Sequence, residues 1–301
     1  MNYMKLLKKT AWIPVIFLLV SSSCNKNKTF SQPDQSNQSS PPAQVSDADL
    51  KALPKDLGGT HTPVVLNATD NTIYGYYLYK PYGYDASTSY YPLLISLTGG
   101  GVEGNSMTNP SDLNKILGGG IQSMIKNNAW APKPAAPRYP MLVITPQITS
   151  PMQSYSPDNL HAFIKSVISK YRVNIHRIYM TGLSTGGSDA FKYVQYYPNG
   201  YVAAIVPTAG VGPSTNFPAY KNFPIWAFVG QNDTKKYISL LPHIDSINKY
   251  STTIKAKITV YPGVGHNCWD MTYNGSGMGS EDPNFDPFNM SVYDWMFQYA
   301  K

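Results

Sequence analysis

Short apolar runs alternate with amphipathic stretches along most of the sequence, and this alternation limits the folds open to the chain. The runs expected to form strands are rich in aromatic and β-branched residues; they lie at 72–79, 91–97, 141–145, 178–181, 202–206, 225–229 and 258–261. Helices are expected at 157–171, between the glycine turn at 182–186 and residue 198, at 243–250 and at 292–299. Strands that alternate with helices predict a mostly parallel sheet covered by helices on both faces.

The stretch after Ser156 carries the clearest helical pattern. Ser156 can cap a helix, and Pro157 suits the first helical position. The apolar residues that follow recur at the spacing of one helical face; they are Leu160, Phe163, Ile164, Val167, Ile168 and Tyr171. In a sheet covered by such helices, ligands bind beyond the carboxyl ends of the strands, so residues that follow predicted strands are the candidates for chemistry.

The start of the sequence has the pattern of an export signal. Three lysines lie among the first ten residues, and the apolar run 11–20 is too short to span a bilayer but has the size of a signal-peptide core. The serines at 21–23 then precede Cys24, which resembles the lipobox of bacterial lipoproteins, where the cysteine carries the lipid. We expect a signal at 1–23 and a lipid anchor on Cys24, on the periplasmic or outer side of a bacterial membrane. The alternative is an ordinary secreted protein.

After the export segment, the sequence divides into a tether and one domain with little net charge. Residues 24–48 are rich in Ser, Gln, Asn and Pro and are expected to be a disordered tether, which leaves one folded domain at 49–301. The sequence has 24 Lys and Arg against 17 Asp and Glu, a net charge of +7. Three of these charges belong to the export segment, so +4 remains, too little and too scattered to indicate a nucleic-acid partner.

The segment Gly182-Leu183-Ser184-Thr185-Gly186 is a G-x-S-x-G pattern in a strand–turn–helix setting. This setting holds a serine on a sharp turn with its hydroxyl exposed, as a nucleophile requires. A side chain at either outer glycine would collide with the neighbouring strand or helix in so sharp a bend. The alternative is a glycine-rich loop whose serine only caps the helix.

A serine nucleophile needs a base to take its proton and an acid to orient that base. Of the five histidines, His266 follows the last predicted strand through a glycine loop, where a base belongs. His243 is the competitor and is expected to open a helix, whereas the remaining three are expected at the surface; these are His61, His161 and His176. Asp233 directly follows the preceding predicted strand, although an aspartate there is also a common turn residue.

Donors for a tetrahedral oxyanion are expected in the loop 98–101, which follows the predicted strand 91–97. Backbone N–H groups in such a loop can point at developing negative charge, together with the N–H of the residue after the nucleophile. We therefore expect Gly100 and Thr185 to supply the two donors. The alternative is that these glycines only form a turn.

Several segments together resemble the secreted esterases of the carboxylesterase, polyhydroxybutyrate-depolymerase and feruloyl-esterase group; they are 77–81 (YLYKP), 98–105 (TGGGVEGN), 146–147 (PQ), 179–187 (YMTGLSTGG), 224–233 (PIWAFVGQND) and 261–270 (YPGVGHNCWD) with Tyr273. The resemblance implies an α/β-hydrolase fold with Ser184 as nucleophile, His266 as base and Asp233 as the acid that orients it, which is also the chain order of α/β-hydrolases.

One position departs from that resemblance. These enzymes usually carry histidine where Thr98 stands, so the geometry of the loop is less determined here. The donors themselves are backbone groups, which threonine keeps, and its hydroxyl can replace the lost side-chain bond to the loop.

The residues and the resemblance together predict a serine esterase that works through an acyl-enzyme, without cofactor or metal, on feruloyl or acetyl esters of plant polysaccharide. Polyesters, lipid esters and peptides are the alternative substrates, and a glycan-binding lipoprotein without activity is the alternative of another class. Gln147 and Trp269 are expected to contact substrate, although a tryptophan there is as often part of the core.

Two neighbours of His266 carry further expectations. Cys268 is expected to be a buried free thiol, because Cys24 is committed to the anchor. The polar, glycine-rich stretch 271–290 either folds over the site as a specificity loop or is solvated surface. Its acidic residues lack the spacing of a calcium site.

Overall fold

The computed structural model describes residues 42–66, 73, 75–131, 137–149 and 154–301. The chain divides into two compact units, 1–37 and 38–301, and all described residues belong to the second unit. The predicted signal, Cys24 and most of the predicted tether therefore lie outside the described residues.

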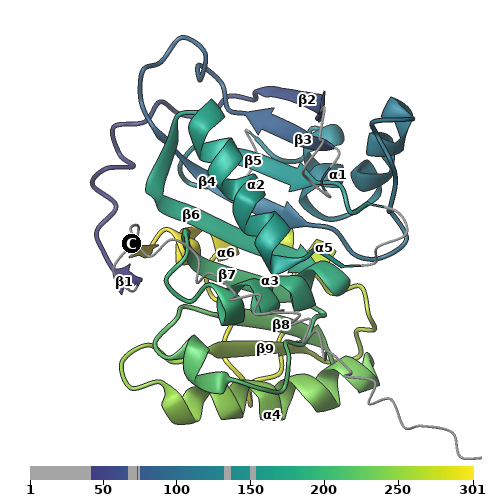
Figure 1. Cartoon of the computed structure of the whole chain (residues 1–301). Helices are drawn as coiled ribbons and strands as arrows, with labels where there is room; N and C mark the ends of the chain where they lie inside the picture. The colour runs from purple at the N-terminus through teal and green to yellow at the C-terminus, as the bar shows by residue number, and fades with distance from the viewer. Residues whose placement is uncertain (1–41, 67–72, 74, 132–136, 150–153) are drawn as a thin grey trace, which may run out of the picture. The chain divides into compact units, whose positions relative to one another are not determined.

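The centre of the domain is an eight-stranded sheet with the order β2-β3-β5-β4-β6-β7-β8-β9 (Figure 1). The strands have the following bounds: β2 Thr60–Val65, β3 Gly75–Lys80, β4 Tyr91–Leu97, β5 Leu142–Pro146, β6 Val173–Leu183, β7 Val202–Thr208, β8 Trp226–Gly230 and β9 Lys257–Tyr261. β3 runs antiparallel to both β2 and β5, and every other neighbouring pair is parallel. The carboxyl ends of β4 to β9 thus meet at one edge of the sheet.

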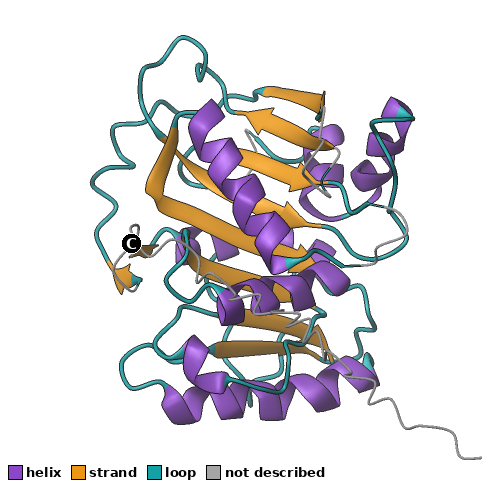
Figure 2. Cartoon of the chain, viewed as in Figure 1, coloured by secondary structure: helices purple, strands orange, loops and turns teal. Residues whose placement is uncertain are grey.

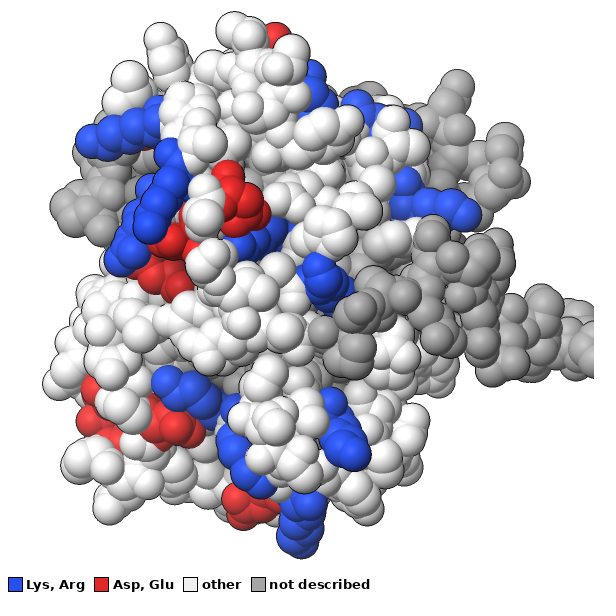
Figure 3. Space-filling view, turned by 90° about the vertical axis from the view of Figure 1, so that its left-hand side faces the viewer, with Lys and Arg blue, Asp and Glu red and all other residues white. Residues whose placement is uncertain are grey.

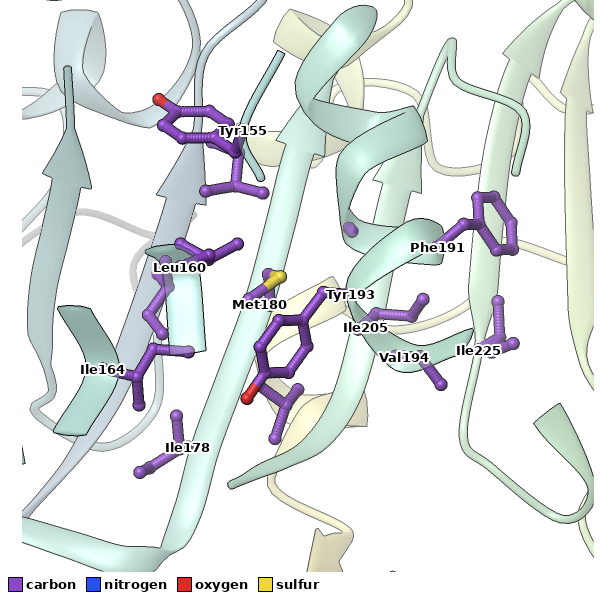
Figure 4. Close-up of a cluster of buried hydrophobic side chains, with 14 of the residues drawn as sticks. Tyr155, Leu160, Ile164, Ile178, Met180, Phe191, Tyr193, Val194, Ile205 and Ile225 are labelled. Carbon is purple, nitrogen blue, oxygen red and sulfur yellow. The ribbon is translucent and has the colours of Figure 1, made fainter. Parts of the chain in front are cut away.

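Helices cover both faces of the sheet (Figure 2). On one face lie α2 (Pro157–Lys170), α3 (Thr185–Tyr196) and α4 (Thr234–Tyr250), and on the other α1 (Gly120–Lys126), α5 (Trp269–Tyr273) and α6 (Val292–Met296). Successive side chains along a strand therefore point alternately into the two cores. In β8, for example, Ala227 and Val229 pack under the first layer, whereas Trp226 and Phe228 face the second. Figure 4 shows part of the first core.

The predicted strands and helices are largely confirmed, with differences at their ends. β4 has the predicted bounds, and α2 begins at Pro157. Ser156 occupies the N-cap position, but its side chain makes no capping hydrogen bond. Of the first predicted strand, residues 75–79 lie in β3, whereas residues 72 and 74 lie outside the described residues. The last helix ends at Met296, earlier than predicted.

The helix expected at 243–250 is wrong at its start, since α4 begins at Thr234 and carries Pro242 in its interior. His243 therefore lies within a helix and does not open one. The sequence analysis also missed β2, the 3₁₀ helices η2 (Pro110–Gly118) and η3 (Phe217–Tyr220), and the short helices α1 and α5.

The two ends of the described chain meet in a small second sheet. β1 (Ala43–Gln44) pairs antiparallel with β10 (Tyr299–Ala300). Two residues of the expected tether, Ala43 and Gln44, thus pair with the end of the domain.

Charged side chains are intermixed on the face of the domain shown in Figure 3, where Lys and Arg lie beside Asp and Glu with uncharged surface between them. The described residues of that face form no continuous basic stripe of the kind that binds nucleic acid. Among the residues described, none of the helices has the length and apolar character needed to cross a membrane.

Candidate active site

Ser184 lies on the turn between β6 and α3 with a strained backbone. Its φ of 54° and ψ of −114° are unusual for a residue with a side chain. A Cβ atom at Gly182 would lie 2.3 Å from the carbonyl carbon of Gly186, and one at Gly186 would lie 2.5 Å from the carbonyl oxygen of Thr98. Neither position can therefore accept a side chain, as predicted for both glycines. The turn holds the Ser184 side chain at the carboxyl edge of the sheet.

The structure brings the three predicted residues into one hydrogen-bonded chain. Nε2 of His266 lies 2.8 Å from Oγ of Ser184, and Nδ1 of His266 lies 2.5 Å from Oδ2 of Asp233. The His266 side chain is 45% exposed and that of Asp233 is 14% exposed, so the base is open to solvent and its acid partner is sheltered. Because Asp233 accepts at Nδ1, the Nδ1–H tautomer of His266 leaves Nε2 free to accept the serine proton.

The loops that carry Asp233 and His266 are tied to each other. Gln231 donates its backbone N–H to Tyr261 at 2.9 Å, and Asn232 donates its own to Val264 at 2.8 Å. A Cβ at Gly230 would lie 2.2 Å from the carbonyl oxygen of Gly265, so the two loops touch where β8 ends. This contact fixes the acid and the base relative to each other before any substrate binds.

The loop after β4 lies directly against the Ser184 turn. A Cβ at Gly99 would lie 2.8 Å from Cδ1 of Leu183 and 3.3 Å from Cβ of Ser184. The space next to Gly100 is bounded by Thr185 and Glu103, whose side-chain oxygens would each lie 3.6 Å from a Cβ at that position. Glu103 accepts the N–H of Gly101 with both carboxylate oxygens, at 2.9 and 3.0 Å.

The Gly100 N–H has no hydrogen-bond acceptor within the described parts of the chain. It is thus available as a donor, as is expected of a group that binds an oxyanion.

The Thr98 hydroxyl bonds to a residue outside the loop 98–101, whereas the sequence analysis considered a bond to the loop itself. Its Oγ1 lies 3.2 Å from the phenol oxygen of Tyr155, which donates to the carbonyl of Pro146 at 2.6 Å. Tyr155 is a site residue that the sequence analysis missed, because it stands just before α2 and no local pattern marks it.

A buried polar group lies beneath the serine turn. The phenol oxygen of Tyr273 lies 2.9 Å from Oγ1 of Thr181 and 3.4 Å from Oγ1 of Thr208, and burial raises the pKa of Tyr273 to about 12. Cys268 is buried nearby as a free thiol, as predicted, and burial raises its pKa to about 12. A thiol with that pKa is protonated at neutral pH and is a poor nucleophile.

Gln147 was expected to contact substrate, but it does not line the site. It is fully buried, its Oε1 accepts the N–H of Ser106 at 3.2 Å, and its Nε2 donates to the carbonyl of Asp112 at 2.8 Å. Both ends of the amide are used to hold the loop before η2 and its first turn. Trp269 does lie at the site, with its ring edge-on to that of His266 at 5.4 Å between centroids.

Among the described residues, the other histidines make no hydrogen bond to Ser184. His243, the predicted competitor, is buried among aromatic rings. His176 is exposed, as expected, but His61 and His161 are half-buried. His61 bonds to Gln122 at 2.5 Å, and the ring of His161 stacks on that of Tyr197 at 4.0 Å.

This arrangement can support nucleophilic attack by Ser184. The imidazole of His266 can take the hydroxyl proton, and the carboxylate of Asp233 can stabilise the imidazolium that results. In the described residues there is no group of three His, Cys, Asp or Glu side chains that could hold a metal ion.

Comparison with known proteins finds similar structures. No protein-family model and no curated protein matches the chain. A solved structure of a thermostable esterase matches with a TM-score of 0.59 at 19% identity, over 80% of this chain and 63% of that one, so this chain spans less than two thirds of that esterase.

Two feruloyl esterases match over nearly their whole length. A mutant of the feruloyl esterase module from Clostridium thermocellum, complexed with sinapinate, has a TM-score of 0.51 at 20% identity, over 87% of this chain and 94% of that one. A ferulic acid esterase has a TM-score of 0.51 at 13% identity, over 74% and 97%. Likeness at such identities concerns the fold alone. Together with the parallel sheet and its helical layers, these matches show that the chain has the α/β-hydrolase fold.

Proposed function

We propose that this chain is a serine hydrolase of carboxylic esters. The observation that carries the proposal is the hydrogen-bonded chain Ser184–His266–Asp233 on a strained turn at the carboxyl edge of the sheet. A buried structural serine has no need of a base within 2.8 Å that is itself oriented by a carboxylate. The esterases among the matched structures are in keeping with it.

The proposed reaction proceeds through an acyl-enzyme. Ser184 attacks the ester carbonyl as His266 takes its proton, and the N–H groups of Gly100 and Thr185 stabilise the oxyanion. His266 then returns the proton to the departing alcohol. Water, activated by the same histidine, hydrolyses the acyl-enzyme and restores the serine.

We propose feruloyl or acetyl esters of plant polysaccharide as substrates. Two matched structures are feruloyl esterases, and one of them holds sinapinate, a relative of ferulate. Trp269 beside His266 supplies an aromatic surface next to the reacting ester, which suits an aromatic acyl group. The open position of His266, with nearly half of its side chain exposed, suits an ester presented on a large polymer.

The proposal also includes export and a lipid anchor on Cys24, which rest on the sequence alone. Labelling of cells with a fatty-acid probe should mark the protein, and Cys24→Ala should remove the label. A Cys24→Ala protein that keeps the label would exclude this anchor.

The direct test combines labelling and turnover. A fluorophosphonate probe should add one equivalent to the wild type, seen by intact mass, and none to Ser184→Ala. Turnover of p-nitrophenyl acetate and methyl ferulate should be lost in Ser184→Ala and reduced up to about 10⁴-fold in kcat in Asp233→Asn. The control is Asp245→Asn, an exposed aspartate on α4, which should keep full activity. A wild type that is neither labelled nor active on either ester contradicts the proposal.

A further inference from the structure

Tyr155 connects three parts of the domain that meet at the candidate site. Its ring packs in the first core, where Figure 4 shows its hydroxyl pointing away from the aliphatic side chains of the cluster. The hydroxyl donates to the carbonyl of Pro146 at the end of β5, at 2.6 Å. A phenol has a single proton, so at the 3.2 Å contact with Thr98 the threonine must be the donor and the phenol oxygen the acceptor.

The position of Tyr155 is itself fixed by the helix that follows the nucleophile. Asp189 of α3 accepts the backbone N–H of Tyr155 at 2.9 Å and the hydroxyl of Ser154 at 2.6 Å. The Asp189 side chain is buried, and burial raises its pKa. A buried carboxylate with two short bonds to adjacent residues leaves the start of this segment little freedom to move.

Through its bond to Tyr155, Thr98 also restricts the movement of the loop that bears Gly100. On its carboxyl side, Gly99 is pressed against Leu183 and Ser184. The carbonyl oxygen of Thr98 lies against Gly186, so close that a Cβ atom at Gly186 would be 2.5 Å from it. The loop between β4 and the Ser184 turn is therefore tightly packed and has little freedom to move. A rotation of the backbone at Thr98 would move the Gly100 N–H relative to Ser184.

The same loop is held at its far end by Glu103, which accepts the Gly101 N–H with both carboxylate oxygens. Gly100 thus stands between two side-chain restraints, one at Thr98 and one at Gly101. Of these two restraints, the one at Thr98 is connected through Tyr155 to Asp189, in the helix that directly follows Ser184.

We propose that Tyr155, acting through the Thr98 hydroxyl, is a positioning residue that sets the Gly100 N–H for the oxyanion. This inference rests on the proposed function, since it concerns the transition state of the same reaction. Tyr155 is buried, with 5% of its surface exposed, so removal of its hydroxyl should leave ground-state binding of the substrate intact. A displaced oxyanion donor weakens binding of the transition state only.

The expected signature is a split between kcat and KM. Tyr155→Phe and Thr98→Val should each lower kcat about 10- to 100-fold, less than the 10²- to 10³-fold that loss of a whole donor costs, with KM within about twofold of the wild type. Thr98→Ser keeps the hydroxyl and should recover most of the activity lost in Thr98→Val. If the two residues act as one unit, the double variant should be little worse than either single variant.

The matched control is Tyr220→Phe. Tyr220 is also buried, and its hydroxyl also donates to a backbone carbonyl, that of Phe191 at 3.0 Å, but among the described residues it makes no hydrogen bond to the loop 98–101. Its removal should cost stability comparable to that lost in Tyr155→Phe while leaving kcat unchanged. A trifluoromethyl ketone, which forms a tetrahedral adduct with a serine, should bind more weakly to Tyr155→Phe in proportion to the fall in kcat/KM, whereas the acid product should bind equally well to both.

The outcomes separate this inference from the proposed function. If the wild type hydrolyses esters through Ser184 but Tyr155→Phe and Thr98→Val keep full kcat, the positioning role is wrong and the esterase stands. A fall in kcat of equal size in Tyr220→Phe would likewise mean that the loss is structural. If Tyr155→Phe does not fold, the comparison of Thr98→Val with Thr98→Ser decides. A wild type without Ser184-dependent turnover overturns both proposals.

Discussion

At the scale of single residues, His243 and His266 occupy opposite environments. His266 is bonded at both ring nitrogens and is partly exposed. His243 is 3% exposed, and neither ring nitrogen has a partner within the residues the structure describes. Aromatic rings surround it; they belong to Phe191, Phe217 and Tyr220. Burial lowers the pKa of His243 to about 4.

This burial predicts a loss of stability in acid that belongs to His243. The pKa of the ring is about 4 in the folded chain and 6.5 unfolded, so between these values the unfolded chain binds the extra proton. The free energy of unfolding should therefore fall as the pH drops from about 6.5 to 4, by roughly 3 kcal/mol from this residue. Urea unfolding at several pH values should show this slope in the wild type and a flatter slope in His243→Leu. The exposed His176→Gln should keep the wild-type slope, and equal slopes in all three proteins would contradict the prediction.

The residues of the site differ in how far the sequence could predict them. Ser184 directly follows β6, and Asp233 and His266 lie in the loops that follow β8 and β9, so a local pattern and the order of the strands were enough to bring them together. The place of Gln147 depends on how the loop before η2 folds back over β5, and its sequence neighbours do not reveal that contact. Tyr155 and Asp189 likewise meet only through tertiary contacts.

At the scale of elements, the segment after α5 has a role that neither expectation for it included. Asp282 donates its backbone N–H to Val260, and Asp286 donates its own to Ile258, each on the outer edge of β9. The side chain of Asp286 accepts the N–H of Ile258 in return, at 2.8 Å. β9 is the last strand of the sheet, so this segment occupies an edge that would otherwise be open to pairing with another chain.

Phe288 attaches this segment to the second core, and its removal should detach the segment. The ring is 1% exposed and contacts the rings of Trp226, Phe228 and Tyr261. Phe288→Ala should lower the free energy of unfolding by about 3–5 kcal/mol, because it leaves a cavity among large rings. Hydrogen exchange should at the same time become faster at the N–H groups of β9 that the segment covers. The partly exposed Met278→Ala, in the same stretch, should change neither measurement by much. Unchanged exchange in β9 would mean that the segment stays attached without Phe288.

The helix α4 shows why an element can start where the sequence argues against it. Proline in a helix interior removes one hydrogen bond and crowds the preceding turn, so Pro242 favoured a start after it. The carbonyl that loses its partner belongs to Ile238, which is 63% exposed, so water can bond to it. Apolar residues on both sides of the proline, among them Leu240 and Ile244, pack into the first core. Burial of one face outweighs the local cost.

At the scale of the whole domain, the two ends of the described chain are joined through one buried side chain. Arg177, in β6, is 2% exposed and pairs with Asp49 by both Nε, at 3.0 Å, and Nη2, at 2.5 Å. It also donates to the carbonyl of Ser46 at 2.7 Å and to that of Phe297 at 2.6 Å. These partners lie 120 or more positions away in the sequence. No local pattern in the sequence could reveal these contacts.

Removal of the guanidinium should loosen both ends together and leave the chemistry intact. The Asp49 side chain is 43% exposed and Ser46 is exposed, so water can replace the bonds of both residues, and the cost of Arg177→Met comes mainly from the buried carbonyl of Phe297. A buried carbonyl left without a donor costs about 1–3 kcal/mol, and a loss of that size in the free energy of unfolding is expected. Limited proteolysis should then cut earlier near both ends. Because Arg177 lies in the first half of β6, far along the strand from Ser184, kcat/KM on p-nitrophenyl acetate should stay at the wild-type value. The control Arg138→Met removes an exposed arginine 3.8 Å from Asp294 and should cost less than about 1 kcal/mol. Equal stability of the two variants would show that the bonds of Arg177 do not hold the ends of the domain.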